Sequence, residues 1–483
     1  IGEYFDAAEQ YKKAYTNTPA KDRKLRGLRA VKLAECYRRI NASQKAIAAY
    51  NNIIRYNQAD SLTHLRLAQQ LMKIGNYRLA EKNFAIAIDS LPNSTIAKNG
   101  LASAKLAPQW KKNGSAYQVK RENMFNSRRS DYSPMLAGDD NDRLYFSSTR
   151  SQTKGDELSG ITGTKTADIF FSQKDEKGKW TKPQTIDTEL NSAYDEGACA
   201  FSPDGRTMYL TQCSSDPSYP RYAVICTSQR ADAIWGKSTP LVISKDTLSS
   251  FAHPAVSPDG TWLYFTSDMP GGIGGLDIWR IQLGKDGVIG GVENLGRPIN
   301  TEGDEMFPTF RPNGDLYFSS NGHPGMGGLD IFIAKRSADG KNIDIEHPGY
   351  PLNSEADDFG MTFEGLKNQG FFSSNRGDAR GWDHIFSFYN PEIVQTVTGW
   401  VYEKDGYELP AAIVYMVGND GTNLKLNVKG DGSFTQQIKP GVDYVLLGTC
   451  KGYLNHQVQL TVEPTNESCD TVLQFPLASI MAP

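Results

Sequence analysis

A chain of 483 residues is too long for a single hydrophobic core, so we expect about three domains. Its 22% charged and 39% apolar residues are typical of folded protein, and no apolar run reaches the roughly 18 to 20 residues that cross a bilayer. The net charge of −3 hides an asymmetry, because residues 1–113 hold 20 Lys and Arg against 8 Asp and Glu.

Residues 1–108 are predicted to form helical repeats with a period of 34 residues. Small residues, an aromatic residue and a terminal proline recur at that spacing, which is the second-helix pattern of a tetratricopeptide repeat. The positions are Ala80, Phe84, Ala87 and Pro92, then Ala46, Tyr50 and Ile53, and at the start Ala7, Tyr11, Ala14 and Pro19. The chain therefore begins inside a repeat, and we expect residues upstream of it. A capping helix is predicted over residues 94–106 and a linker over residues 108–114.

The concave face of such an array predicts a groove for a partner. By repeat position it would present Glu35, Arg38, Arg39, Gln69 and Lys73. These residues are the candidate partner-binding positions, and ordinary solvated positions are the alternative. The excess of Lys and Arg over Asp and Glu in residues 1–113 likewise fits either an acidic partner or a solvated helical surface.

Residues 115–395 contain a second repeat, built from strands. A hydrophobic segment ending in Ser or Thr occurs five times, at residues 144–148, 208–211, 263–267, 316–320 and 371–374. The spacing of 53 to 64 residues predicts a five-bladed β-propeller. Tetrapeptides such as Ser257-Pro258-Asp259-Gly260 predict hairpin turns between the first two strands of a blade, and similar ones occupy residues 202–205 and 311–314.

An aspartate recurs at one place in the strand repeat. Residues 274–279 read Gly-Gly-Leu-Asp-Ile-Trp and residues 327–332 read Gly-Gly-Leu-Asp-Ile-Phe, with weaker copies near residues 168 and 383. The four acids are Asp168, Asp277, Asp330 and Asp383. We expect each to hydrogen-bond the turn of its own blade, and a ring of acids or a metal site is the alternative.

Residues 116–120 resemble an outer strand without a blade ahead of it. We therefore expect this segment to pair with residues near 388 and to close the ring of blades. The first blade carries about ten extra residues, 153–162, where a scaffold would display a binding loop. In the second blade, residues 221–225 replace the Gly-Gly-Leu-Asp-Ile motif.

From residue 396 to 483 the pattern changes to short alternating strands. Residues 397–402, 409–414, 430–434 and 444–447 predict a small antiparallel β-sandwich. The complete fold prediction is thus a multidomain α plus all-β chain, with tetratricopeptide-type repeats, a five-bladed propeller and a C-terminal sandwich.

The six cysteines follow no metal-ligand spacing, and no cofactor or metal site is predicted. Cys213 and Cys226 flank a Ser/Pro-rich turn, where antiparallel pairing would set them opposite one another, and Cys450 and Cys469 are a second possible disulfide. Buried free thiols are the alternative. No nucleic-acid motif is present.

A catalytic constellation is absent from the sequence. There is no Gly-x-Ser-x-Gly elbow of a propeller peptidase, and Gly271-Gly272-Ile273-Gly274-Gly275 lacks the following helix of a phosphate loop. We therefore expect no enzyme. The alternative is a carbohydrate- or peptide-processing propeller with acids converging on its central channel.

The order of these parts resembles multidomain proteins of the Bacteroidota in the outer-membrane-protein-A family, and is closest to PorE-type components of the type IX secretion system. The Gly-Gly-x-Asp-Ile repeats look like the WD40-like repeats of TolB, and Gly430-Asp431-Gly432-Ser433-Phe434 is similar to a carboxypeptidase-regulatory-like domain. The resemblance covers nearly the whole chain.

This resemblance implies a non-enzymatic periplasmic scaffold at the outer membrane, joining envelope or secretion-system proteins to the cell wall. Peptidoglycan would be bound by a domain that is not in these residues, and an upstream lipid would anchor the chain. A TolB-like role in envelope integrity is an alternative. The first residues lack the pattern of a signal peptide, so the chain is either cytosolic or has lost its targeting segment.

Overall fold

The computed structural model describes residues 3–150, 158, 166–186, 189–192, 194–213, 223–337, 340–391, 395–462 and 469–481. No helix within these ranges is long and apolar enough to cross a membrane. The chain divides into two compact units. Unit 1 comprises residues 1–334, 345–365 and 370–389, and unit 2 comprises residues 335–344, 366–369 and 390–483. The predicted binding loop at 153–162 lies outside the described residues, apart from Leu158, as does the start of the segment 221–225.

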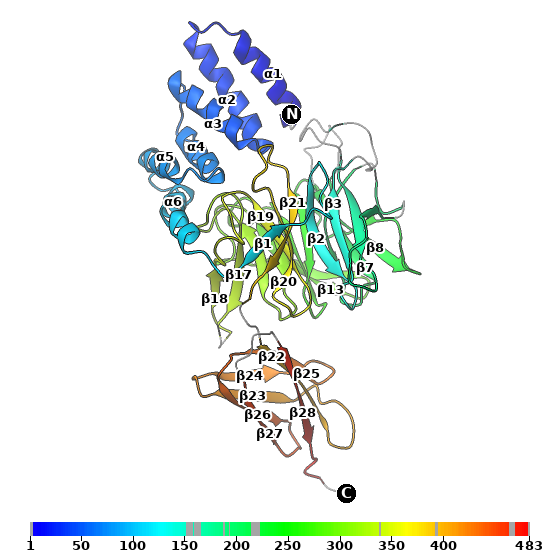
Figure 1. The fold of residues 1–483 in the computed structure, drawn as a ribbon. Coiled ribbons are helices and arrows are strands. Elements are labelled where there is room, and N and C mark those ends of the chain that lie inside the picture. The colour runs from blue at the N-terminus through cyan, green and yellow to red at the C-terminus, as the bar shows by residue number, and fades with distance from the viewer. Residues whose placement is uncertain are drawn as a thin grey trace. The chain divides into compact units, whose positions relative to one another are not determined.

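Unit 1 begins with helices, each of which packs against the next along the chain (Figure 1). They are α1 Tyr4–Asn17, α2 Arg23–Arg39, α3 Ser43–Arg55, α4 Thr63–Lys73, α5 Tyr77–Ser90 and α6 Thr95–Asn113. Fully buried alanines, among them Ala34, Ala46 and Ala68, allow neighbouring helices to approach closely. The side chains of Asp22, Asn76 and Ser94 accept backbone N–H bonds at helix starts, as the N-cap preference predicts.

The predicted linker over residues 108–114 is wrong. Helix α6 continues through Pro108 to Asn113 and ends at Gly114, whose φ of 65° is left-handed. Proline removes one backbone donor, but packing of Ala104 and Ala107 in the helical core holds the helix across that position.

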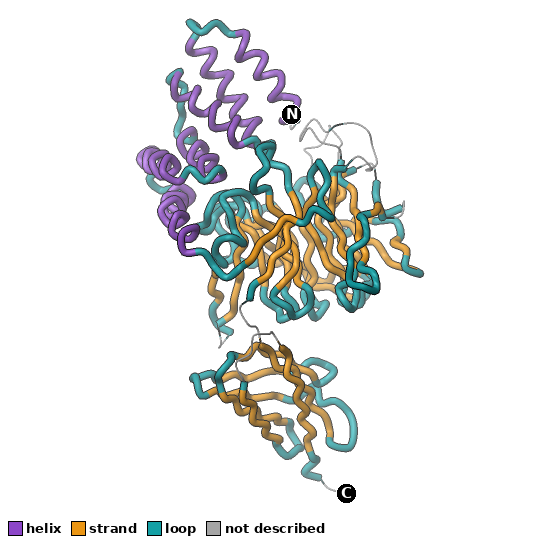
Figure 2. The backbone as a smooth tube through the Cα atoms, viewed as in Figure 1, coloured by secondary structure: helices purple, strands orange, loops and turns teal. Residues whose placement is uncertain are grey.

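The strands before residue 390, drawn in orange in Figure 2, form five small antiparallel sheets. Their orders are β2-β3-β4-β5, β6-β7-β8-β10 with β9 beside β8, β11-β12-β13-β14, β15-β16-β17-β18, and β19-β20-β21-β1. The bounds are β1 Gln118–Arg121, β2 Asp131–Ala137, β3 Arg143–Ser148, β4 Asp168–Gln173, β5 Gln184–Thr185, β6 Asp195–Phe201, β7 Thr207–Cys213, β8 Ala223–Ala231, β9 Ile234–Trp235, β10 Thr239–Pro240, β11 Phe251–Val256, β12 Trp262–Ser267, β13 Asp277–Gly284, β14 Gly287–Asn294, β15 Glu305–Phe310, β16 Leu316–Ser320, β17 Asp330–Arg336, β18 Ile343–Glu346, β19 Asp358–Phe363, β20 Gln369–Ser374 and β21 His384–Tyr389.

Local features of the strand repeat agree with the sequence. The five predicted hydrophobic segments are β3, β7, β12, β16 and β20, each the second strand of its sheet. The turns at residues 202–205, 257–260 and 311–314 close with a backbone bond from their glycine, and Gly205, Gly260 and Gly314 have the positive φ that the turn requires. The segment near residue 117 pairs with the one near 388, because β1 is antiparallel to β21 with Val119 opposite Phe388.

The predicted fold class is corrected. The described residues form six short helices and 28 strands, and the strands are divided among seven small sheets. Neither a tetratricopeptide array nor a closed five-bladed propeller is established by these elements. A repeat period determines where strands and turns recur along the chain, but it does not determine the family of fold that they build.

Unit 2 contains two sheets over a core that includes Val397, Val414, Phe434 and Phe475. Their orders are β25-β22-β28 and β24-β23-β26-β27, with β22 Gln395–Glu403, β23 Ile413–Gly418, β24 Asn423–Asn427, β25 Ser433–Ile438, β26 Asp443–Thr449, β27 His456–Thr461 and β28 Cys469–Leu477. The predicted antiparallel arrangement is wrong in one pair. Strand β28 runs parallel to β22, because the last strand enters beside the first rather than through a hairpin.

Candidate functional site

Unit 1 contains a cavity of about 570 Å³ with a polar lining, referred to below as the polar cavity. One wall comes from α2, α4 and α6, and the other from the loops around β15, β16 and β17. Its charged and polar lining residues are Arg38, Arg39, Asn41, Gln69, Gln70, Lys73, Asn99, Ser103, Glu302, Asp304, Asn321, His323 and Asp357. Carboxylates, cations and carboxamides therefore meet in one space.

Four of the five predicted groove residues line the polar cavity, namely Arg38, Arg39, Gln69 and Lys73. The fifth, Glu35, forms ion pairs with three arginines. Its carboxylate lies 2.5 Å from Arg38, 3.1 Å from Arg39 and 3.2 Å from Arg66. Burial opposes ionisation of Glu35, but bonds from Arg38 and Arg39 and the charge of Arg66 outweigh it and lower its pKa. Glu35 thus orients the arginines of this wall.

A polar bridge joins the helices to the loop before β19. Asn41 donates to Asp357 Oδ2 at 2.9 Å and accepts from Lys73 Nζ at 2.7 Å, while Lys73 Nζ lies 3.7 Å from Asp357. Burial would raise the pKa of Asp357, but the Lys73 charge and hydrogen bonds from Leu329, Asn41 and Asn375 lower it. A carboxylate is thereby kept ionised at one end of the polar cavity.

A second bridge comes from α6. Asn99 donates to the carbonyl of Gly322 at 3.1 Å, and the backbone N–H of Gly325 donates to Ser103 Oγ at 3.1 Å. Met326 is fully buried in the helical core, and Trp110 stacks on His347 with ring centroids 4.0 Å apart. These contacts connect the two walls of the polar cavity directly.

Close approach of the loops explains the paired glycines of the repeat. A Cβ on Gly327 would lie 1.7 Å from the carbonyl oxygen of Glu355, so no other residue fits there without moving the backbone. Both Gly327 and Gly328 line the polar cavity, where they expose backbone rather than side chain.

One acceptor in the lining has no donor. Gln70 is 3% exposed, and its Oε1 is buried without a hydrogen-bond partner in the described part of the chain. Such an acceptor costs about 1–3 kcal/mol unless a ligand or water supplies a donor. Gln69 was predicted to line a groove and Gln70 was not, although Arg66, Gln69, Gln70 and Lys73 have the spacing of one helix face.

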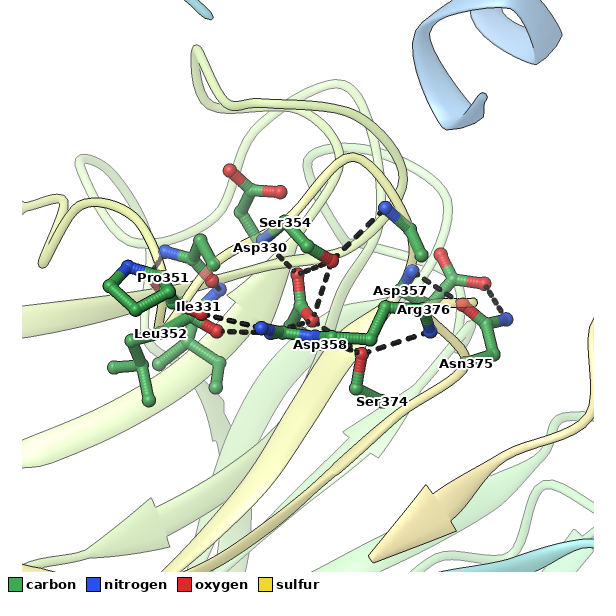
Figure 3. A network of polar contacts seen from close by, with 12 residues as sticks. Asp330, Ile331, Pro351, Leu352, Ser354, Asp357, Asp358, Ser374, Asn375 and Arg376 are labelled. Atoms are coloured by element: carbon green, nitrogen blue, oxygen red, sulfur yellow. Dashed lines mark hydrogen bonds and ion pairs between the residues drawn. The ribbon is translucent and has the colours of Figure 1, made fainter. Parts of the chain in front are cut away.

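A second set of acids, which was not predicted from the sequence, repeats at the first strand of four sheets. The members are Asp131, Glu196, Glu305 and Asp358, each fully buried four residues after a Ser or Thr whose backbone N–H it binds. Figure 3 shows the network of Asp358, whose carboxylate accepts from Ser354, Ser374 and Arg376. The signal was present as Asn-Ser/Thr followed four residues later by an acid.

The four acids differ in whether an arginine pairs with their carboxylate. Arg150 and Arg376 lie 2.8 Å from Asp131 and Asp358. Burial raises the pKa of Asp358 to about 6 even though Arg376 opposes the rise. Glu305 receives Thr301 and Ser320 but no arginine among the described residues, and burial raises its pKa to about 7.

The predicted hydrogen bond from a motif aspartate to the turn of its own sheet is present at Asp277 and Asp330. Asp277 accepts from the N–H of Ile273 at 2.5 Å, and Asp330 accepts from the N–H of Met326 at 2.5 Å and lies 2.7 Å from His347 Nε2. Asp383 differs, because no hydrogen bond to its carboxyl group occurs within the described ranges. Burial, together with Asp357 and Asp378, raises the pKa of Asp383 to about 8. Asp168 is fully buried at the start of β4.

All six cysteines are free thiols. The register sets Cys226 opposite Leu210 and Cys213 opposite Ala223, so the predicted pairing of Cys213 with Cys226 has no support from the strands. Cys226 therefore lies three residues along β8 from the residue opposite Cys213, which is farther than a disulfide spans. Cys450 and Cys469 are likewise unpaired.

A small cavity of about 20 Å³ lies where β-bulges of the first strands meet. Its lining includes Ser133, His253 and Phe307, and His253 stacks on Phe307 with centroids 3.6 Å apart. Burial lowers the pKa of His253 to about 3, so this ring is neutral. Among the residues that line this small cavity none has a carboxyl group, whereas Glu302, Asp304 and Asp357 line the polar cavity. No group of three metal-ligating side chains occurs within the described part of the chain.

No family model and no curated protein matches the chain. It is similar to a thermostable family-43 glycoside hydrolase (TM-score 0.37, 11% identity, 56% of this chain and 91% of that one). It is also similar to an α-L-arabinofuranosidase from Lactobacillus brevis (TM-score 0.35, 10% identity, 63% and 95%) and to an endo-arabinase from Bacteroides thetaiotaomicron VPI-5482 (TM-score 0.34, 18% identity, 58% and 96%). Two further matches, a 3-chlorocatechol 1,2-dioxygenase from Rhodococcus opacus 1CP and a puromycin-hydrolysing peptidase of Mycobacterium tuberculosis, are covered over only 61% and 33% of their length.

The expectation that the chain is not an enzyme is corrected by these matches, because glycoside hydrolases are among the solved structures that align with more than half of it. TM-scores below 0.4 do not assign their activity to this chain either.

Proposed function

We propose that this chain is a binding protein that receives an extended polar segment of a partner polypeptide in the polar cavity. The observation that supports this proposal is the lining itself, in which carboxamides, cations and carboxylates face a space of about 570 Å³. A carboxamide offers a donor and an acceptor, as a peptide group does, and the unpartnered Oε1 of Gln70 is suited to a backbone N–H.

The partner in this proposal is a protein of the bacterial envelope, and the location is the periplasm at the outer membrane. Both rest on the resemblance of the repeats to the outer-membrane-protein-A family and to TolB. A type IX secretion-system subunit is one such partner.

Site-specific cross-linking tests the proposal. A photo-crosslinking residue would replace Gln69 in the polar cavity of the full chain, and Lys82 on the exposed side of α5 as a matched control. We expect position 69, and not position 82, to cross-link a defined segment of an envelope protein. A synthetic peptide of that segment should bind the wild type at least tenfold more tightly than Gln69→Trp, which places a bulky side chain in the cavity, and as tightly as it binds Lys82→Trp. The same products at both positions, or none at position 69, would contradict the proposal.

A second candidate function is glycoside hydrolysis. It is favoured by the presence of three carboxyl groups, those of Glu302, Asp304 and Asp357, on the lining of one cavity, since this reaction uses a pair of carboxyl groups. A hydrogen bond from Arg297 lowers the pKa of Glu302, so Glu302 suits the ionised partner of such a pair.

Turnover distinguishes the two candidates. The full chain would be incubated with arabinan and other polysaccharides, and new reducing ends would be counted. Turnover that is lost in both Glu302→Gln and Asp304→Asn supports hydrolysis. Cross-linking from position 69 without turnover supports binding alone.

A further inference from the structure

Three arginines surround one tyrosine ring at the N-terminal helices of unit 1. The guanidinium carbons of Arg23, Arg26 and Arg55 lie 5.5, 5.7 and 5.7 Å from the centroid of the Tyr56 ring. Arg26 also lies 4.6 Å from the Tyr15 ring. The start of α2 and the end of α3 thus bring three positive charges together beside Tyr15 at the end of α1, and none of these residues lines the polar cavity.

No carboxylate in the described part of the chain pairs with these charges. None of the three arginines has an ion pair within the described ranges, and the nearest acid in sequence, Asp22, accepts the N–H of Leu25 as the cap of α2. Their hydrogen bonds are to neutral oxygens: Arg26 donates to the Tyr56 hydroxyl at 3.3 Å, and Arg23 donates to the carbonyl of Arg55 at 2.8 Å.

One donor of the cluster is buried and unused. Arg26 Nε has no hydrogen-bond partner among the residues that the structure describes, although it is shielded from solvent. A buried unpaired donor on a charged group is costly, and three like charges within a few ångströms of one ring repel one another. The two features together indicate a position that an anion would complete.

The electrostatic field of the cluster acts on the tyrosines. A hydrogen bond with Tyr15 and then the charges of Arg26, Arg55 and Arg23 lower the pKa of Tyr56. The same positive field would attract an oxyanion, and guanidinium groups present paired N–H donors that match phosphate oxygens.

We propose that Arg23, Arg26 and Arg55 form a binding site for a phosphate group, carried by free phosphate or by the head group of an anionic lipid. A phosphate with up to two negative charges offsets more of the three positive charges than a single carboxylate does. The site is independent of the polar cavity and of the function proposed for it.

Calorimetric titration of the full chain with inorganic phosphate, at constant ionic strength set by chloride, tests this proposal. Flotation with vesicles of phosphatidylglycerol, compared with phosphatidylcholine, forms the second arm. The variants are Arg23→Ala/Arg55→Ala, which changes only exposed residues, and Arg26→Met, which keeps the packing against Tyr15. Arg78→Ala, an exposed arginine on α5, is the matched control.

We expect binding in at least one arm, weakened at least tenfold by the double variant and by Arg26→Met and unchanged by Arg78→Ala. Binding of inorganic phosphate identifies the free ion as a sufficient ligand, and binding of anionic vesicles alone identifies the lipid head group. Absence of binding in both arms, or equal binding by the wild type and the double variant, would overturn the proposal. Circular dichroism of each variant shows that a loss is not caused by unfolding.

Discussion

Asp358 and Glu305 occupy equivalent places at the start of β19 and β15, yet their buried charges are balanced differently. Asp358 has Arg376, which also donates to the carbonyls of Pro351 and Leu352. In the other sheet Gly322 stands where the sequence pattern has Arg376, and a Cβ there would lie 1.8 Å from Thr301 Oγ1. The adjacent His323 replaces part of the arginine, because its Nε2 lies 2.7 Å from the carbonyl of Ile299.

The two sheets thus differ at one position, which is Arg376 in one and Gly322 in the other. The sheet with the arginine holds its acid ionised at neutral pH by a cation. The sheet without it leaves its acid half-titrated near neutral pH, and it presents His323, Gly325 and Asn321 to the polar cavity instead. Gly322 therefore leaves the space that an arginine side chain would occupy on this wall of the cavity.

Removing Arg376, the cation that pairs with Asp358, should have the largest effect on stability. Arg376→Met leaves the Asp358 charge buried and unpaired, which costs about 3–5 kcal/mol in the free energy of unfolding at pH 8. Denaturant unfolding of the full chain measures this loss. Arg380→Met, which breaks the pair of an arginine that is 53% exposed with Asp378, is the control and should cost at most about 1 kcal/mol. Equal losses would show that Arg376 does not balance the buried charge.

Breaking the link between neighbouring sheets should cost about as much in both regions. Asn353 accepts from the N–H of Ile331 at 2.6 Å and donates to its carbonyl at 2.9 Å, and Asn300 does the same with Ile278. Asn353→Ala and Asn300→Ala each leave two buried backbone groups unpaired, so we expect a loss of about 2–4 kcal/mol in the free energy of unfolding. The exposed Asn342→Ala should have no measurable effect. A loss below about 0.5 kcal/mol in either variant would show that its carboxamide is not needed.

The pH dependence of stability should reveal the unpaired acid Glu305. The pKa of Glu305 is raised from 4.5 to about 7 in the folded state, so the folded protein binds more protons between these values and its stability falls as pH rises through them. Glu305→Gln removes this contribution. We expect it to be more stable than the wild type by roughly 2–3 kcal/mol at pH 8 and equally stable at pH 4. Parallel pH profiles of the two proteins would contradict the assignment.

Loosening the bridge at the end of the polar cavity should have the smallest effect. Lys73→Met removes a bond to Asn41 and a 3.7 Å contact with Asp357, both partly solvated, so we expect at most about 1 kcal/mol in the free energy of unfolding. Nuclear magnetic resonance should show a higher pKa for Asp357 in this variant, because its largest opposing charge is lost. The exposed Lys82→Met is the control and should leave that pKa unchanged.

Much of the local structure could be predicted because it depends on neighbours in sequence. Turns such as residues 257–260 follow from Pro258 and Gly260, and the strand at residues 263–267 follows from its apolar run. The linker predicted at Pro108 failed because tertiary packing held α6 together across it. The pairing of Cys213 with Cys226 was not supported, because it required a register that only the neighbouring strands set.

The candidate site was predicted in part. Helical spacing alone placed Arg38, Arg39, Gln69 and Lys73 on one wall. Glu302, Asp304, His323 and Asp357 were not predicted, because they lie more than 200 residues away along the chain and reach the cavity only when the loops pack against the helices. Asp383 departs from its motif for the same reason, since its environment is made by Asp357 and Asp378.

The sequence by itself determined the hydrophobic second strand of each sheet before residue 390, the turns before three of them, the pairing of the segments near residues 117 and 388, and four residues on one wall of the polar cavity, since these depend on periodicity and on local backbone preference. Only the tertiary structure decided the fold class, the parallel entry of β28, the second wall of the cavity and the charge state of the buried acids. These depend on contacts between residues distant in the chain, whose burial and opposing charges no single stretch of sequence contains.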